Sequence, residues 1–278
     1  MKNIKLFFGV ALFATVLFSA CKPNNEPPKE VEISLDTDVI TLMIGETHEL
    51  TATVVFPADA TDKTIAWTTD NSGIAIVENG IVTALAPGTA NIYAKAGGKT
   101  AVCEVNVPPA VKINGVVWAM YNVDAFGTFA PTPESAGCFY QWNRPKAWAA
   151  TGDVTGWDGT TPTGTTWEAA NDPCPNGWRV PTSGELESLV DAGSFWATDG
   201  VTSGRVFGTA PNQIFLPAVG WRVDSAGSSY AGSEGCYWSS TKSYSNEAYS
   251  LCFSSSSNAY VEGDTFRFCG FSVRCVAE

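Results

Sequence analysis

The chain contains a single histidine, His48, among its 278 residues. Catalytic triads, zinc centres and imidazole acid–base pairs need histidine beside the reacting atoms, so most of these designs are excluded. Basic residues are also scarce: 16 Lys and Arg stand against 28 Asp and Glu, which gives a net charge of −12. A nucleic-acid partner needs a basic face, so we expect none. The two shortages predict a protein that is not an enzyme and that holds no metal or other cofactor.

Charged residues make up only 16% of the chain, whereas 26 Gly, 16 Pro and 12% aromatic residues are present. This composition is too apolar for a disordered chain and favours strands, turns and loops over helices. The length fits two domains, each with its own hydrophobic core. We therefore predict a mainly β protein with some α structure.

The N-terminus has the pattern of a secretory signal. Lys2 and Lys5 precede an uncharged apolar run from Leu6 to Ala20, which is too short to cross a membrane as a helix. The sequence predicts a signal peptide at residues 1–20.

The end of this run, Leu17-Phe18-Ser19-Ala20-Cys21, resembles the lipobox of bacterial lipoproteins. The resemblance implies that Cys21 is lipidated and becomes the first mature residue, with residues 21–30 as a Pro/Asn/Glu-rich tether. We expect the lipid to anchor the protein to the outer membrane, exposed at the cell surface. The alternative is an ordinary signal peptide whose Cys21 later joins a disulfide.

Residues 31–107 show short stretches of alternating polar and apolar residues separated by turn signals. The clearest predicted strands are 32–35, 48–54 and 64–68, and Asn79-Gly80 is a typical turn. This pattern predicts an antiparallel β-sandwich.

Within this segment, Gly45, Trp67, Gly80–Ala84 and the closing Ala101–Val105 follow in an order that resembles the bacterial Ig-like group 2 family. In that family such domains mostly act as stalks and spacers on surface proteins. We expect Trp67 to be a core residue rather than a sugar platform, and Cys103 to be a buried thiol.

Pro108 and Pro109 cannot continue a central strand, so residues 108–110 are predicted to link the sandwich to a second domain at 111–278. That domain opens with a hairpin around Asn114-Gly115. A helix is predicted to begin at a Thr182 or Ser183 cap.

Six blocks of the second domain, in this order, resemble the major paralogous domain family of Fibrobacter succinogenes: Val111–Asn122, Asp172–Thr182, Ser183–Leu189, Leu216–Gly220, Gly235–Thr241 and Phe271–Val276. The resemblance implies a C-terminal C-type-lectin-like α+β domain, with two small sheets, one or two helices, long loops and the two chain ends paired in one sheet. Calcium-binding lectins of this fold use Trp-Asn-Asp, but Arg144 follows Trp142-Asn143 here, so we expect no calcium site.

Eight cysteines in an exported chain indicate an oxidising compartment. Lipidation of Cys21 would leave seven, so at least one would be unpaired or pair between chains. The same resemblance places the Cys174 block beside the last strand, which implies a disulfide between Cys174 and Cys275. The remaining pairings in the second domain stay open for Cys138, Cys236, Cys252 and Cys269.

The segment Ala248–Val273 is dominated by Tyr, Ser, Asn, Phe and Gly. This composition resembles that of antibody paratopes, in which rigid aromatic residues give contact area and small polar residues adapt their hydrogen bonds to the ligand. It also resembles the variable region of proteins diversified by retroelements, whose NNC codons never encode Lys, Glu, Gln, Met or Trp; the segment holds one of these types, Glu262. The predicted ligand-binding residues are Tyr244, Asn246, Tyr249, Phe253, Asn258, Tyr260, Phe266, Arg267 and Phe268. An ordinary strand-and-loop segment with Leu251, Phe253 and Phe271 buried explains the pattern equally well.

The sequence therefore predicts a surface lipoprotein whose head binds a protein or glycan ligand. One alternative is a fimbrial or surface-assembly subunit whose head docks another subunit. A less favoured alternative is a polysaccharide hydrolase, which would need two carboxylates to converge in a cleft with one pKa raised. The pairs considered for that role are Asp153/Asp158, Asp191/Asp199 and Glu185/Glu187.

Overall fold

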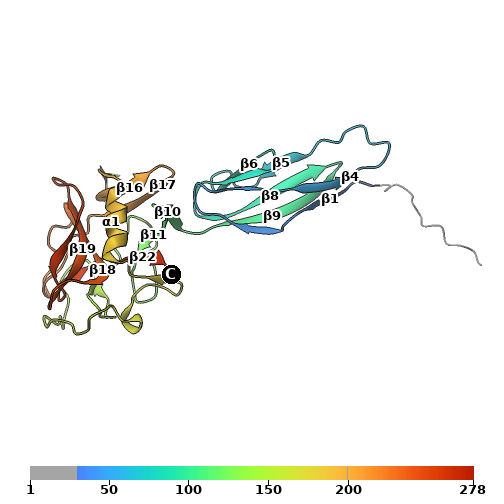
Figure 1. Ribbon diagram of the computed structural model, residues 1–278. Coiled ribbons are helices and arrows are strands. Elements are labelled where there is room, and N and C mark those ends of the chain that lie inside the picture. The colour runs from blue at the N-terminus through green and yellow to red at the C-terminus, as the bar shows by residue number, and fades with distance from the viewer. Residues whose placement is uncertain (1–29, 199) are drawn as a thin grey trace, which may run out of the picture.

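The structure, a computed structural model, describes residues 30–198 and 200–278. The predicted signal peptide, the lipidation site Cys21 and all of the tether except Glu30 lie outside the described residues. The described chain is mainly β with one α-helix, as the composition predicts. Within these residues, no helix is both long and apolar enough to cross a membrane. Figure 1 shows two domains joined end to end, an N-terminal Ig-like domain and a C-terminal head.

The N-terminal domain is a β-sandwich. Its main layers are a four-stranded sheet in the order β2-β9-β8-β5 and a three-stranded sheet in the order β3-β7-β6, and β1 pairs with β4. The strands are β1 (Glu32–Leu35), β2 (Val39–Thr41), β3 (Thr47–Glu49), β4 (Ala52–Val55), β5 (Ala66–Thr69), β6 (Ala75–Glu78), β7 (Ile81–Ala84), β8 (Gly88–Ala96) and β9 (Lys99–Val107). Cys103 is fully buried in the core between the sheets, and Trp67 packs against that core, as expected.

Two details of the predicted sandwich are wrong. The single strand expected at 48–54 is two strands, because the chain changes sheets at Leu50, which is buried in the core and donates its N–H to the Gly80 carbonyl. The sandwich is also not wholly antiparallel, since β2 runs parallel to β9. Local alternation shows which residues face inward, but it does not show which strand becomes the neighbour.

The joint between the domains is short. Strand β9 ends at Val107 and β10 begins at Ala110, so Pro108 and Pro109 lie between them. Met120 of the head packs against the core of the Ig-like domain. On the other side of the joint, Gly45 lies directly against Pro211 of the head.

The head is built from four small sheets and long loops. The sheets have the orders β10-β11-β22-β14, β13-β12-β21, β15-β16-β17 and β18-β19-β20. The elements are β10 (Ala110–Ile113), β11 (Val116–Asn122), β12 (Cys138–Gln141), β13 (Trp148–Ala149), the 3-10 helix η1 (Ala169–Asn171), β14 (Trp178–Arg179), α1 (Ser183–Asp191), β15 (Ser194–Thr198), β16 (Ser203–Thr209), β17 (Asn212–Pro217), β18 (Glu234–Lys242), β19 (Glu247–Ser254), β20 (Tyr260–Phe266), β21 (Gly270–Phe271) and β22 (Arg274–Ala277).

The two ends of the head lie side by side, because β11 pairs with β22. The hairpin β10–β11 turns at Asn114-Gly115, where both residues have positive φ (48° and 87°), as a two-residue type I′ turn requires. Helix α1 begins after Thr182, whose hydroxyl accepts from the Glu185 N–H while the Glu185 carboxylate accepts from the Thr182 N–H. This capping box fixes the helix start that the sequence predicts.

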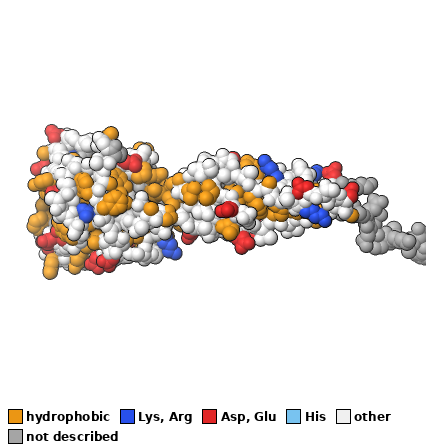
Figure 2. Space-filling model, turned by 90° about the horizontal axis from the view of Figure 1, so that it is seen from above, with side chains coloured by type: hydrophobic (Ala, Val, Ile, Leu, Met, Phe, Trp, Pro, Cys, Tyr) orange, Lys and Arg blue, Asp and Glu red, His pale blue; other side chains and the backbone are white. Residues whose placement is uncertain are grey.

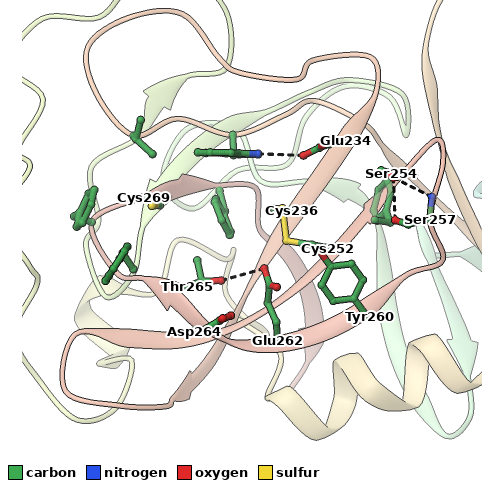
Figure 3. Close-up of a pocket in the computed structure, with 16 residues that line it drawn as sticks. Glu234, Cys236, Cys252, Ser254, Ser257, Tyr260, Glu262, Asp264, Thr265 and Cys269 are labelled. Carbon is green, nitrogen blue, oxygen red and sulfur yellow. Dashed lines mark hydrogen bonds between the residues drawn. A yellow bond between two sulfur atoms is a disulfide. The ribbon is translucent and has the colours of Figure 1, made fainter.

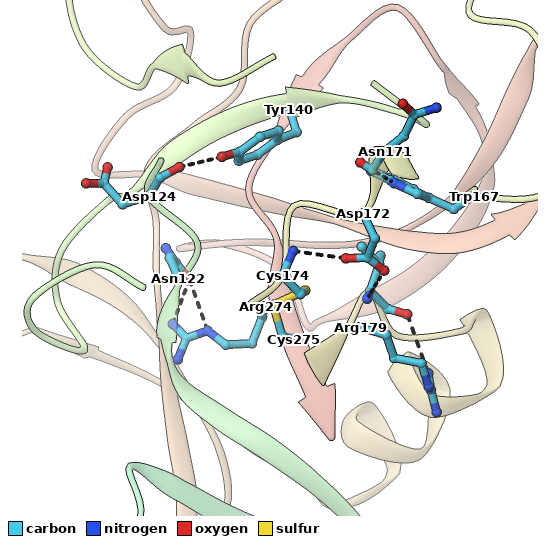
Figure 4. Close-up of a disulfide and its surroundings, with 11 residues drawn as sticks. Asn122, Asp124, Tyr140, Trp167, Asn171, Asp172, Cys174, Arg179, Arg274 and Cys275 are labelled. Carbon is cyan, nitrogen blue, oxygen red and sulfur yellow. Dashed lines mark hydrogen bonds between the residues drawn. A yellow bond between two sulfur atoms is a disulfide. The ribbon is translucent and has the colours of Figure 1, made fainter. Parts of the chain in front are cut away.

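Two disulfides fasten the head. Cys174 is bonded to Cys275, the pair expected, which ties the loop before β14 to the last strand (Figure 4). Asp172 fixes the same loop, since its carboxylate accepts from the N–H groups of Cys174 and Val180. The second disulfide joins Cys236 to Cys252, directly opposite each other on β18 and β19. Among the described cysteines, Cys103, Cys138 and Cys269 remain free thiols.

Candidate functional site

The sheet β18-β19-β20 separates two environments. On one face, Tyr237, Leu251 and Val261 pack with Leu186 and Leu189 of helix α1. Because side chains alternate along a strand, the neighbouring residues point to the opposite face. That face carries two cross-strand rows: Cys236, Cys252 and Tyr260, and then Trp238, Ser250 and Glu262.

A cavity of about 510 Å³ opens over this second face; we call it the sheet pocket. Its volume lies in the range of small-ligand sites. Apart from the sheet and its β19–β20 loop, the lining is supplied by Trp221 and Val223 and by the chain from Phe268 to Phe271. The aromatic rings that line the pocket are Trp221, Phe253, Tyr260, Phe266, Phe268 and Phe271.

Four of these rings form two contacting pairs. Phe266 stacks on Phe268 with ring centroids 5.6 Å apart, and Trp221 meets Phe271 edge to face at 6.4 Å. Tyr260 and Phe266 are 47% and 45% exposed, so they stand at the rim rather than in the core. Figure 2 shows hydrophobic side chains reaching the surface across one face of the head, with acidic side chains at its margin.

Three carboxylates also line the pocket: Glu234, Glu262 and Asp264. Figure 3 shows the Glu262 side chain pointing toward the Cys236–Cys252 bond, beside Tyr260 on the same strand. Burial and the neighbouring Asp264 carboxylate raise the pKa of Glu262 above its usual value. A 3.5 Å hydrogen bond from the Thr265 hydroxyl opposes this shift only in part. Trp221 donates its indole N–H to Glu234 at 3.5 Å.

The pocket therefore has a negative electrostatic field. Partial burial and then Glu262, Glu234 and Asp264 raise the pKa of the Tyr260 hydroxyl. Burial also raises the pKa of the Cys269 thiol to about 12, so this thiol stays protonated and is a poor nucleophile at neutral pH.

Four of the predicted ligand-binding residues meet in the sheet pocket: Phe253, Tyr260, Phe266 and Phe268. Phe253 is only 2% exposed and stacks on Tyr237, so most of its ring belongs to the core. Tyr260, Phe266 and Phe268 are the members of the group that offer surface to a ligand.

Four other predicted residues lie away from the pocket lining. Tyr244 is 72% exposed in the β18–β19 loop, where the Asn246 carbonyl accepts the Arg267 N–H. Tyr249 packs against Gly263, where a Cβ atom would lie 2.7 Å from its ring. Asn258 accepts a hydrogen bond from the Arg205 guanidinium at 3.3 Å.

Arg267 has a structural role, which corrects its prediction as a binding anchor. It is 4% exposed, and its guanidinium donates to the carbonyls of Gly164 and Ser245 at 2.9 and 2.6 Å. The same group lies over the Trp142 ring, 4.9 Å from its centroid. The composition of the segment predicts Arg267 as a ligand contact. Its burial depends on loops that are distant in the sequence.

The walls and the charge of the pocket were not predicted from the sequence. Trp221 and Glu234 precede the segment 248–273 in the sequence. They come next to it only because the chain folds, so local pattern could not place them in the pocket. The Cys236–Cys252 bond had a usable signal, since both cysteines fall in adjacent strand-like blocks that a hairpin would align. In the sequence, Glu262 stands out only as an exception to the NNC codon pattern, and its place in the pocket has no local signal.

The carboxylates considered for a hydrolase do not form the pocket. Glu185 pairs with Arg179 and caps helix α1, and Asp158 pairs with Arg144 at 2.8 Å. Asp199 lies outside the described residues. Across residues 30–198 and 200–278, no group of three His, Cys, Asp or Glu side chains is placed to hold a metal ion.

Two families match parts of the chain. Residues 31–107 match the bacterial Ig-like domain (group 2), which confirms that predicted domain and its bounds. Residues 181–276 match a family described as a domain of unknown function (DUF8237). This second match contains strands β18 to β20 and the whole pocket lining. It gives no support to the expected resemblance of the head to the Fibrobacter family.

A 60-residue stretch is 43% identical to an uncharacterized protein of Clostridium acetobutylicum and covers 21% of this chain and 15% of that protein. Domains 4 and 5 of the S-layer protein SbsC are similar over 28% of this chain and 51% of theirs, with 22% identity and a TM-score of 0.24. Domains 5–6 of the same protein are similar over 84% of this chain and 97% of theirs, with 11% identity and a TM-score of 0.24. The chain thus spans a small part of the Clostridium protein and about half of the first SbsC structure. The Ig-like domain of group 2, at residues 31–107, is the part of the chain assigned to a family of known fold.

Proposed function

We propose that this protein is a surface-associated binding protein, in which the Ig-like domain is a spacer and the head binds a protein or glycan ligand in the sheet pocket. The observation that carries the proposal is the open cavity of about 510 Å³ with exposed aromatic rings at its rim. Exposed aromatics beside a cavity are typical of binding hot spots. In Figure 1 the strands β18 and β19 lie at the end of the head that faces away from the Ig-like domain, which suits display to a partner.

The proposal includes lipid attachment at Cys21 and location at the outer membrane. Its support is the lipobox-like end of the apolar run and the Pro/Asn/Glu-rich stretch that follows. A C-type-lectin-like fold for the head is also part of the proposal, supported by the pairing of β11 with β22 and by the long loops between short strands. Retroelement diversification of residues 248–273 stays a prediction from composition.

The proposal assigns binding and no catalytic step, with no cofactor and no nucleic-acid partner. The charge of the pocket supports the absence of a nucleic-acid partner, because its carboxylates would repel phosphate. Glu262 is the pocket carboxyl whose pKa is raised. Burial and the neighbouring Asp264 explain the raised pKa without a catalytic role for Glu262.

The test is a glycan and surface-protein array probed with the full chain. A Tyr260→Ala/Phe266→Ala variant is expected to weaken the strongest hit at least about 30-fold, because each ring is an anchor of hot-spot size. Tyr244→Ala is the matched control, since this tyrosine is more exposed but does not line the pocket. An equal loss in both variants, or none in the double variant, would place the site elsewhere. An array without any hit would overturn the binding proposal in favour of the assembly-subunit alternative.

A further inference from the structure

The sheet pocket accepts hydrogen bonds far more readily than it donates them. Its strongest polar groups are the carboxylates of Glu234, Glu262 and Asp264, and its lining contains no Lys, Arg, His, Asn or Gln. Ionised carboxylates only accept hydrogen bonds. A ligand that fits such a lining should carry donors and a positive charge.

Apart from the Tyr260 hydroxyl at the rim, the stronger donors in the lining have partners within the protein. The Trp221 indole N–H is directed at Glu234, and the Thr265 hydroxyl is within 2.9 Å of the Ser250 hydroxyl. Ser254 and Ser257 bond to each other, with their hydroxyl oxygens 2.9 Å apart. Sugar hydroxyls both donate and accept, so a neutral sugar would leave most of its own acceptors without partners here.

The arginines next to the pocket in sequence point away from it. Arg267 follows Phe266, but its guanidinium donates to the Gly164 and Ser245 carbonyls. Arg222 lies between Trp221 and Val223 and donates to backbone carbonyls, including those of Ala149 and Gly152. In the described part of the chain, neither forms an ion pair, and none of the three pocket carboxylates has a basic partner. The negative charge of the pocket is therefore left uncompensated.

The rings add a second preference. Aromatic faces attract cations, and an apolar stem can pack along them while its charged end reaches a carboxylate. Tyr260 stands at the rim, two residues from Glu262 on the same face of β20, and Figure 3 shows its ring beside the Glu262 side chain. A long basic side chain has this combination of apolar stem and donor-only tip.

We propose that the sheet pocket binds a lysine side chain of a protein partner, with its ammonium group at Glu262 and its methylene stem along the ring of Tyr260. The inference rests on the proposed function, because it uses the same pocket and narrows the ligand from protein or glycan to a basic protein side chain. The raised pKa of Glu262 agrees with the lysine proposal. Its ionised form is disfavoured by burial and by Asp264, so a bound cation would stabilise it strongly.

The probe is the capped amino acid N-acetyl-lysine methylamide, titrated into the full chain and followed by ligand-observed NMR. Its neutral counterpart is N-acetyl-norleucine methylamide, which keeps the stem and lacks the ammonium. We expect the lysine probe to bind at least about tenfold more tightly, the size of a charge-assisted hydrogen bond in a partly dry site. Glu262→Gln should remove this difference. Glu187→Gln is the matched control, because it deletes the same charge from the exposed side of helix α1, behind the sheet.

Glu262→Gln should fold normally, because it removes a carboxylate that burial and Asp264 disfavour in the folded state; its thermal unfolding is the check. Equal affinity for both probes, or equal loss in the Glu262 and Glu187 variants, would overturn the lysine inference and leave the binding proposal standing. Tighter binding of glucosamine than of the lysine probe would also overturn it, in favour of an amino sugar. If neither probe binds, the lysine inference fails, and the array result decides the proposed function separately.

Discussion

Four arginines of the head are buried and act as internal supports for its loops: Arg205, Arg222, Arg267 and Arg274. None of them forms an ion pair with the described residues, and each donates to at least two backbone carbonyls. Burial lowers the pKa of each guanidinium, and that of fully enclosed Arg274 falls to about 10, so all four stay charged at neutral pH. A domain with short sheets leaves many loop carbonyls without ladder partners, and a guanidinium with five donors can satisfy several at once.

This role predicts the effect of Arg267→Met. Methionine keeps an apolar stem against Trp142 but removes the donors to Gly164 and Ser245, so we expect a loss of about 2 kcal/mol in the free energy of unfolding. Urea denaturation measures it. Arg179→Met is the control, because its ion pair with Glu185 is partly exposed and should be worth less than about 1 kcal/mol. Equal losses in the two variants would contradict the supporting role.

At the residue scale, sequence reasoning succeeds where the neighbours are local. Asn114-Gly115 and the Thr182 cap depend on a few adjacent residues, and both have the structure their chemistry predicts. Arg267 and Glu262 depend on loops brought together from distant segments. Their burial, and so their roles, could not be inferred from composition alone.

At the element scale, the two disulfides restrain the head in different ways. Cys174–Cys275 joins residues 101 apart and ties β14 to the last strand, whereas Cys236–Cys252 joins residues 16 apart within one hairpin. Closing a longer loop removes more entropy from the unfolded chain. The first bond fastens the two ends of the domain, and the second supports the floor of the sheet pocket.

The difference in loop length predicts an order of stabilities. Cys174→Ala/Cys275→Ala should lower the free energy of unfolding by about 4 to 5 kcal/mol, and Cys236→Ala/Cys252→Ala by about 3 kcal/mol. Denaturant unfolding of both double variants, with the free thiol variant Cys138→Ala as the control, tests this order. A larger loss for the hairpin pair would show that folded-state packing outweighs chain entropy.

Strand order is where sequence reasoning about elements failed. The alternation at 48–54 identifies inward-facing residues correctly, but one ladder partner of that stretch is β7 and the other is β1. The chain passes from one sheet to the other at Leu50, whose side chain is buried in the core. The same limitation concealed the sheet pocket, because its two walls come from strands and loops that alternation cannot pair.

At the scale of the whole molecule, the joint determines how the head is presented. Two-domain chains move about their linkers unless a packed interface prevents it. Here the linker is Pro108-Pro109, Met120 reaches the Ig-like core, and Gly45 lies against Pro211. These contacts predict an Ig-like domain and a head held in one arrangement, which would keep the sheet pocket at a fixed distance from the far end of the Ig-like domain.

The contact at Gly45 can be tested with a matched pair of glycines. Gly45 and Gly98 have nearly the same backbone conformation, with φ of +83° and +80°, so alanine should cost each about 1 kcal/mol of local strain. A Cβ atom at Gly45 would lie 2.9 Å from Cγ of Pro211, whereas one at Gly98 meets no atom within 4 Å. We therefore expect Gly45→Ala to push the domains apart and broaden the pair-distance distribution in small-angle X-ray scattering, while Gly98→Ala leaves it as in the wild type. The same distribution for both variants would mean that Gly45 does not fix the joint, and that the head moves freely on its spacer.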